Sequence, residues 1–366
     1  ADVLQIMEAE ERPGLLALLD EATRREVAAL LAYAEDEAGG LMNPRFARVR
    51  PEMTVEEAIR YLRLQTQTNL ATPYYAYALD ASQRLLGVVS FRELFLSRGD
   101  RLVSDVMRKD VISAPERLDQ EAVSQLIAVH NLTAIPVVDD EGRMKGVVTV
   151  DDIVDVVQEE ATEDIQKMGG MEALEIPYMQ TRLLPLIRKR AGWLALLFLG
   201  EMLTATAMGR FEHEIAQAVV LALFVPLIIS SGGNSGSQAT TLVIRAMALG
   251  EVKLRDWARV MRRELLCGVA LGSILALIGA VRISVWERAF GAYGAHWTLL
   301  AITVSASLLF VVVFGTLAGS MLPFALRRAG LDPASASAPL VATLVDVSGL
   351  VIYFSVASWI LHGAML

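Results

Sequence analysis

Apolar stretches long enough to cross a membrane fill the second half of the chain, and they constrain the fold more than any other feature. We predict five spans, over residues 191–209, 215–249, 265–283, 297–326 and 338–361. About 20 apolar residues cross the hydrocarbon core as a helix. Backbone polar groups in lipid must be bonded internally, so a helical bundle is the expected architecture. The second and fourth stretches exceed the required length, which predicts tilt, kinks or extension beyond the bilayer.

Charge divides the chain where these stretches begin. The 366 residues carry a net charge of −9, whereas residues 191–366 contain nine acidic and eleven basic side chains. Residues 1–190 are therefore strongly acidic. An acidic surface excludes nucleic-acid binding through phosphate contacts, and divalent cations are its natural counterions. The single cysteine, Cys267, lies in an apolar segment, which excludes a disulfide framework and a thiolate metal site.

An internal repeat occupies residues 41–160. Its copies, residues 41–102 and 103–160, each run through a strand, a helix, a strand, a turn, a Gly-Val-Val strand and a helix. Met42 and Met107 are equivalent positions, as are Gly87 and Gly146. The repeat predicts two copies of one small α/β domain. Residues 1–40 read as helix, and we interpret them as the remnant of a larger helical domain.

Acidic residues recur at spacings of three and four in the helix that ends the repeat. They are Asp152, Asp155, Glu159, Glu160, Glu163 and Asp164. This spacing places like charges on neighbouring faces of one helix, where they repel each other. A solvated acidic face is one interpretation. The other is a divalent-cation sensor, which the position just before the membrane segments favours, because loss of the cation would drive the elements apart. A connecting helix over residues 161–188 is expected to join the two halves.

Small and polar residues interrupt the second apolar stretch between Pro226 and Arg245. The glycines there would free backbone groups, and Asn234, Ser237 and Gln238 would be unsatisfied in lipid. This pattern predicts a break in the helix that faces a water-filled path. Close helix packing through small residues is the alternative interpretation.

Asp346 lies within the fifth stretch, with about eight apolar or small residues on each side. A charge at that depth costs about 3 kcal/mol or more, so it indicates a functional site. Mg²⁺ is usually held by one or two carboxylates and keeps several waters. We predict that two copies of Asp346 in a symmetric dimer hold a hydrated Mg²⁺, whose waters donate to the carbonyls of Ala342 and Thr343. Pairing of Asp346 with a basic residue is the alternative.

Glu201, in the first stretch, is a weaker candidate of the same kind. A structural role, paired with Arg245 or with the hydroxyl of Thr204, is equally compatible with the sequence.

Basic residues predict the orientation of the bundle. With the N-terminus inside, the inner flanks hold eleven Lys and Arg residues and the outer flanks three, which places the N-terminus in the cytoplasm and the C-terminus outside. A divalent cation moving inward gains about 4.6 kcal/mol per 100 mV. The sequence contains no G-x-x-x-x-G-K-[ST] motif, so a passive channel is favoured over a pump.

The order of these parts resembles the MgtE family of bacterial magnesium channels over essentially the whole chain, and the repeat resembles a pair of CBS domains. The family signature of the second span is matched by Pro226, Gly233, Asn234, Gly236 and Gln238, and the sequence PLVATLVD ends in Asp346. The resemblance implies a multi-domain membrane protein with a cytosolic α/β CBS pair and an all-α transmembrane domain, residues 189–366, of five helices. It also implies a homodimer whose second and fifth spans line the pore.

The resemblance further implies Mg²⁺ uptake across the bacterial cytoplasmic membrane, with closure by intracellular Mg²⁺. The sensing positions carried over by motif are Glu121, Asp152, Asp155, Glu160, Glu163 and Asp164, together with Asp119 and Gln120. Two departures weaken the match. Most of the family's N-terminal domain is missing from this sequence, and Ala338 stands where a polar residue such as Asn is expected.

A nucleotide such as ATP at the CBS pair is a further expectation. Thr149 and Asp152 match the family pattern in the second copy, whereas the first copy has Ser90 and Glu93, and a purely structural pair is the alternative. Two other functions remain open: a broader divalent-cation channel or exchanger that passes Co²⁺ or Mn²⁺, and a membrane sensor that transports nothing. The residues show no catalytic constellation, so we do not expect an enzyme.

Overall fold

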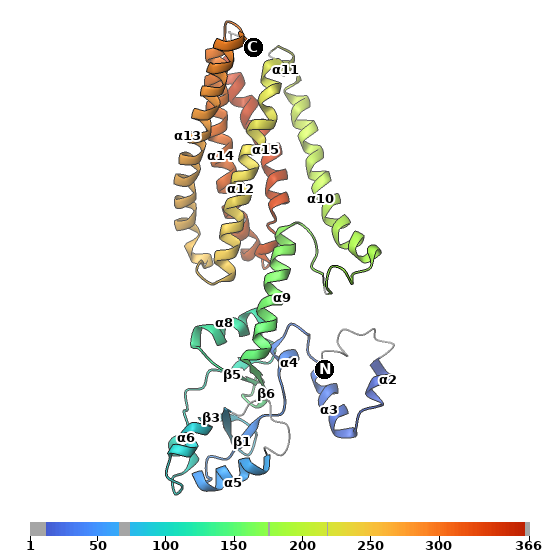
Figure 1. Ribbon diagram of the computed structural model, residues 1–366, viewed down its shortest axis with the longest axis vertical. Helices are drawn as coiled ribbons and strands as arrows, with labels where there is room; N and C mark the ends of the chain where they lie inside the picture. The colour runs from blue at the N-terminus through green and yellow to red at the C-terminus, as the bar shows by residue number, and fades with distance from the viewer. Residues whose placement is uncertain (1–11, 66–73, 175, 218, 363–366) are drawn as a thin grey trace. The chain divides into compact units, whose positions relative to one another are not determined.

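The computed structural model describes residues 12–65, 74–174, 176–217 and 219–362 (Figure 1). It divides into two compact units, residues 1–161 and 162–366, and the boundary falls inside helix α9 (Val150–Met168). Part of the predicted N-terminal remnant, residues 1–11, lies outside the described residues. The part that is described is helical, with α2 (Arg12–Leu16), α3 (Glu21–Leu30) and α4 (Ala38–Leu41).

The first unit contains two three-stranded sheets of identical topology. In the first, β1 (Ala47–Val49) pairs in parallel with β2 (Tyr75–Leu79), which pairs antiparallel with β3 (Leu85–Ser90). The second repeats this order with β4 (Ala114–Pro115), β5 (Ala134–Val138) and β6 (Met144–Thr149). The helices of this unit are α5 (Val55–Gln65), α6 (Phe91–Leu96), α7 (Val103–Val106), α8 (Gln120–His130) and the start of α9. The predicted α/β repeat is confirmed.

Each copy of the repeat is completed by a methionine near the start of the other copy. A β-carbon added to Gly87 of β3 would lie 2.6 Å from Met107 Sδ, and one added to Gly146 of β6 would lie 2.7 Å from Met42 Cγ. The backbones pair across the same boundaries, at Asn43–Val147 and Val88–Arg108. This exchange explains why both copies carry a methionine and a glycine at equivalent positions, and it joins the copies into one body.

The described part of the second unit contains five helices that are long and apolar enough to cross a membrane, as predicted. They are α10 (Leu183–Arg210), α12 (Val225–Ala248) preceded by η1 (Val219–Phe224), α13 (Trp257–Phe290) preceded by η2 (Leu254–Asp256), α14 (Trp297–Arg328) and α15 (Ala338–Leu361). Two short elements complete the unit: α11 (Glu212–Gln217) after α10, and η3 (Pro333–Ser335) before α15.

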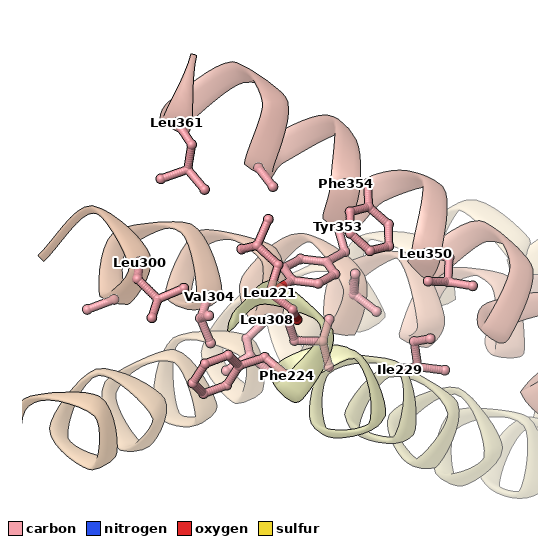
Figure 2. Packing of buried hydrophobic residues seen from close by; sticks show 14 of the residues in the cluster. Leu221, Phe224, Ile229, Leu300, Val304, Leu308, Leu350, Tyr353, Phe354 and Leu361 are labelled. Atoms are coloured by element: carbon pink, nitrogen blue, oxygen red, sulfur yellow. Dashed lines mark hydrogen bonds between the residues drawn. The ribbon is translucent and has the colours of Figure 1, made fainter. Parts of the chain in front are cut away.

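Helices α12, α14 and α15 form the buried centre of the second unit, and α13 packs on α14. Figure 2 shows Tyr353 of α15 beside Leu221 of η1, with Phe354 and Phe224 in the same buried cluster. The Tyr353 hydroxyl donates to the Leu221 carbonyl at 2.8 Å, which satisfies the polar end of an otherwise apolar ring. Helix α10 is the exception in this bundle, because it packs mainly on α15 and Leu197 is its one buried side chain.

The connecting helix is shorter than predicted. The expected range of 161–188 is wrong, because α9 ends at Met168 and α10 begins at Leu183. Gly169 and Gly170 follow the last helical residue, and Gly170 adopts a positive φ of 72°. Glycine reaches this left-handed conformation without a steric penalty and commonly terminates a helix there.

The predicted break in the second span is also wrong. Helix α12 runs without interruption from Val225 to Ala248, through all three glycines. Pro226 lies in its first turn, where a missing N–H costs nothing. The backbone groups of the glycines are therefore used within the helix rather than exposed to a water-filled path.

Candidate cation pathway

The glycines of α12 bring its backbone against α14. A β-carbon at Gly236 would lie 2.8 Å from the carbonyl oxygen of Gly315. The Thr240 hydroxyl lies 2.7 Å from the Gly319 carbonyl, to which it donates. Small residues that permit such close approach, together with interhelical hydrogen bonds, stabilise helix pairs in membranes. The alternative reading of this stretch, close packing, therefore describes Gly236.

Three of the residues predicted to line a pore lie on the face of α12 turned away from this contact. Pro226, Asn234 and Gln238 are exposed in the single chain, whereas Gly233 and Gly236 are buried. The Asn234 amide donates to Ser230, one turn earlier on the same face, at 3.4 Å. The five residues predicted to line a pore thus divide into an exposed row, in which Asn234 and Gln238 are polar, and a buried packing surface. An exposed amide at membrane depth requires water or protein beside it.

A second close contact, between α10 and α15, brings two carboxylates together. A β-carbon at Gly200 would lie 2.8 Å from Thr343 Cγ2, so the helices nearly touch at this level. One residue further along α10, the Glu201 carboxyl reaches hydrogen-bonding range of the Asp346 carboxyl on α15. Asp346 is partly buried. The charged neighbour of Asp346 is thus another acid, and pairing with a basic residue is not what the structure shows.

Neither of the two partners expected for Glu201 is the one that the structure shows. Its carboxyl lies beside Asp346 rather than beside Arg245. The Thr204 hydroxyl is buried without a hydrogen-bond partner in the described part of the chain, so it does not bind Glu201 either. Two acids that face each other on membrane-spanning helices repel unless a cation or a proton lies between them. This pair is the arrangement that most strongly indicates a cation pathway.

Ala342 and Thr343 lie within α15, one turn before Asp346. Their carbonyls accept the hydrogen bonds of the helix, so each offers its second lone pair to water. Ala338 begins the same helix, and its carbonyl accepts a hydrogen bond from Ser237 of α12 at 3.3 Å. The backbone of Ala338 thus contributes a contact to α12 that does not depend on the expected polar side chain.

A second acidic group lies at the end of α9. Lys167 donates to Asp332 Oδ2 at 2.6 Å and forms a salt bridge with Glu163. Asp332 also caps η3 by accepting from the Ala334 amide at 2.8 Å. Burial raises the pKa of Asp164, and the negative charge of Asp332 raises it further. Glu163 and Asp164, both predicted to sense cations, therefore meet Asp332 from a distant part of the chain.

The other predicted sensing residues lie in the first unit, and several of them form hydrogen bonds there. Gln120 donates to Glu160 at 2.5 Å, and Gln125 donates to Glu121 at 3.2 Å. Asp152 accepts from the Thr149 hydroxyl at 2.6 Å. Asp155 is exposed. Across the described residues, no group of three or more His, Cys, Asp or Glu side chains is placed to hold a metal ion.

The Thr149–Asp152 pair bears on nucleotide binding. Ser90 and Glu93 form the same turn in the first copy, where each side chain bonds the other's backbone. The Ser90–Glu93 pair therefore caps the helix that follows, and the Asp152 carboxylate makes the corresponding bonds to the Thr149 N–H and hydroxyl. The geometry does not by itself indicate a nucleotide, and ATP binding stays a prediction.

Sequence reasoning missed Lys167 and Asp332. Lys167 lies four residues after Glu163, a spacing that favours an ion pair along a helix, and this signal was available. At Asp332 the sequence indicates only a local role, as the capping residue before Pro333. Its contact with Lys167 joins residues 165 positions apart, which a single sequence does not reveal.

The sequence of the chain matches known protein families in both of its halves. A profile of the MgtE divalent cation transporter family matches residues 225–356, and the CBS domain profile matches residues 38–98 and 103–159. The chain is 43% identical to the magnesium transporter MgtE of Thermus thermophilus, over 99% of this chain and 79% of that protein. It is 34% identical to the magnesium transporter MgtE of Enterococcus faecalis, over 91% of this chain and 71% of that protein.

One solved structure is also similar. It is described as the cytosolic domain of the Mg²⁺ channel MgtE in complex with ATP, and it is 44% identical to this chain. It covers 42% of this chain and 63% of the solved chain, with a TM-score of 0.41.

Proposed function

The chain belongs to the MgtE family of divalent cation transporters, and from this premise we propose that it conducts Mg²⁺ passively past Asp346. Relatives of this kind are transporters and not enzymes. The observation that carries the proposal is the pair of acids, Asp346 and Glu201, facing each other on two membrane-spanning helices. A mobile cation between the two carboxylates relieves their repulsion. The cation can leave them again without any covalent step.

The chemistry of the pair suits a hydrated divalent ion. Mg²⁺ loses water reluctantly and is usually held by one or two carboxylates with several waters retained. The second lone pairs of the Ala342 and Thr343 carbonyls can accept hydrogen bonds from those waters. An inside-negative potential drives a divalent cation inward by about 4.6 kcal/mol per 100 mV, so passage needs no other energy source.

A homodimer is part of the proposal. In one chain, Asn234 and Gln238 of α12 are exposed at membrane depth, where contact with lipid is unfavourable. A second copy related by a two-fold axis would cover this row and add a second Asp346. The polar row would then line the path while the buried glycines hold α12 on α14. The proposed orientation, with the N-terminus cytoplasmic and the C-terminus outside, follows from the basic flanks.

Closure by cytoplasmic Mg²⁺ is the proposed regulation. Glu163 and Asp164, near the end of α9, lie close to Asp332. Asp332 directly precedes η3, which leads into α15. Since α15 carries Asp346, a change of charge at this end can be transmitted to the pathway along one helix. The predicted sensing residues of the first unit, Glu121, Asp152, Asp155 and Glu160, would extend this response.

Mg²⁺ uptake into liposomes tests the proposal. Purified protein is reconstituted with an internal Mg²⁺ indicator, and the wild type is compared with Asp346→Ala. We expect the variant to lose about a hundredfold or more of the initial rate, which corresponds to about 2.7 kcal/mol. Glu264→Gln, a matched carboxylate on α13, should retain uptake. Undiminished uptake by correctly assembled Asp346→Ala protein would refute the pathway.

Competition by Co²⁺ and Mn²⁺ in the same assay separates a magnesium-selective channel from a broader one. Absence of any flux from the wild type would instead favour a sensor that transports nothing.

A further inference from the structure

Lys167 already occupies the position of a cation between the acids at the end of α9. Its ammonium donates to Asp332 at 2.6 Å and pairs with Glu163, one helical turn earlier. The Lys167 side chain is 28% exposed and both acids are 37% exposed. The contact is therefore partly shielded from water, yet ions from solution can reach it.

Electrostatics keep this ammonium charged. Burial works against the charged form of Lys167, but its hydrogen bonds to Asp332 and Glu163 raise its pKa above the ordinary value. Burial and the nearby charge of Asp332 raise the pKa of Asp164 as well, while Lys167 and Arg245 oppose that increase. Three carboxyl groups thus share the field of one ammonium, so its removal would leave them mutually repulsive.

Apolar packing holds the end of α9 independently of the ion pair. Met168 packs against a cluster made of Ile244 from α12 and Ala334 and Ala336 from the turn before α15. A β-carbon on Gly170 would lie 2.7 Å from the Trp193 ring nitrogen, so the chain after α9 is also closely packed. The Lys167 side chain is flexible, and it can leave Asp332 without undocking the helix.

We infer that Lys167 is a built-in competitor of Mg²⁺, which holds the acids at the end of α9 when Mg²⁺ is scarce and is displaced when Mg²⁺ is plentiful. This inference rests on the proposed closure by cytoplasmic Mg²⁺. It adds that Lys167 sets the Mg²⁺ concentration at which closure occurs. The alternative role, a structural strut that fixes the closed arrangement, makes the opposite prediction for removal of the ammonium.

The test uses the full chain in planar bilayers, with the Mg²⁺ concentration varied on the face that carries α9. The quantity measured is the concentration that halves the current. Lys167→Gln should halve its current at about one tenth of the wild-type concentration, because the carboxylates lose a competing charge within a few ångström. Lys167→Met should shift the same way, and Lys167→Arg, which keeps the charge, should stay within about twofold of the wild type.

An unchanged or increased half-closing concentration in Lys167→Gln would overturn the inference. Asp332→Asn separates this failure from failure of the proposed closure. If Asp332→Asn raises the half-closing concentration while Lys167→Gln leaves it unchanged, the acids respond to Mg²⁺ and the competitor role is wrong. If the wild type itself does not close with Mg²⁺, the proposed regulation fails and this inference fails with it.

Discussion

Two acidic groups of the second unit differ in what faces them. Asp346 faces Glu201 on another membrane-spanning helix, whereas Asp332 and Glu163 face the ammonium of Lys167. An acid pair that contains its own cation is partly neutralised, and an acid pair without one depends on a cation or proton from elsewhere. The comparison suggests a division of roles, in which the pair within the bundle passes a mobile ion and the group at the end of α9 responds to its concentration.

The largest expected effect on transport comes from a substitution in the acid pair formed by Asp346 and Glu201. Glu201→Gln should lower Mg²⁺ uptake into liposomes by about tenfold or more, equivalent to at least about 1.4 kcal/mol, because one of two facing carboxylates is lost. Glu201→Asp keeps the charge and should fall between the variant and the wild type. Uptake by Glu201→Gln equal to that of Glu264→Gln would show that Asp346 acts without its neighbour.

An intermediate effect is expected at Met168, the apolar residue that follows Lys167. Met168→Ala removes apolar contact with Ile244 and the turn before α15, which for a partly buried side chain costs about 1 kcal/mol. The end of α9 should then dock less firmly, and the half-closing Mg²⁺ concentration should rise about fivefold. Because Lys167→Gln is expected to move it downward, variants that shift in the same direction would argue against separate roles for packing and charge.

The smallest effect concerns Asp164. Its pKa is raised in the folded protein from an ordinary value of 3.8, first by burial and then by Asp332. The folded state therefore prefers the protonated acid, so the charged acid destabilises it at pH values above the folded pKa. Asp164→Asn should raise the Tm by about 1–3 °C at pH 7 without Mg²⁺.

The advantage of Asp164→Asn should shrink as the pH falls through the folded pKa toward 3.8, because the wild-type acid becomes neutral as well. Thermal unfolding in detergent over this pH range measures both parts. A gain in Tm that is independent of pH would contradict the electrostatic cause.

Much of the fold could be predicted because it follows from local patterns. Apolar length predicted five spans, and the repeat predicted two copies of one α/β domain. The sequence could not distinguish the two uses of glycine in α12, since the residues that would break a helix also allow it to approach another. Gly236 lies against Gly315, a residue 79 positions later, and this contact decides the question. The predicted connecting helix is too long because the prediction does not treat Gly169 and Gly170 as the end of a helix, and α9 ends at Met168.

The candidate site was predicted in part for the same reason. Asp346 was identifiable from its depth in an apolar segment, and Glu163 and Asp164 from their spacing. The partners of these acids come from remote parts of the chain: Glu201 is on another span, and Asp332 follows α14. Local chemistry therefore indicated which residues carry charge at costly positions, and tertiary packing determined which of them face each other.

Matched substitutions at the two acidic groups test the division of roles most directly. Asp346→Asn and Asp332→Asn each replace one aspartate by its neutral isostere, and both are assayed by initial Mg²⁺ uptake into liposomes that contain no Mg²⁺ at the start. The account predicts that Asp346→Asn loses about a hundredfold of the rate, while Asp332→Asn keeps the wild-type rate and differs only when Mg²⁺ is present on the face that carries α9. Full uptake by Asp346→Asn, or equal loss in the two variants, would contradict it.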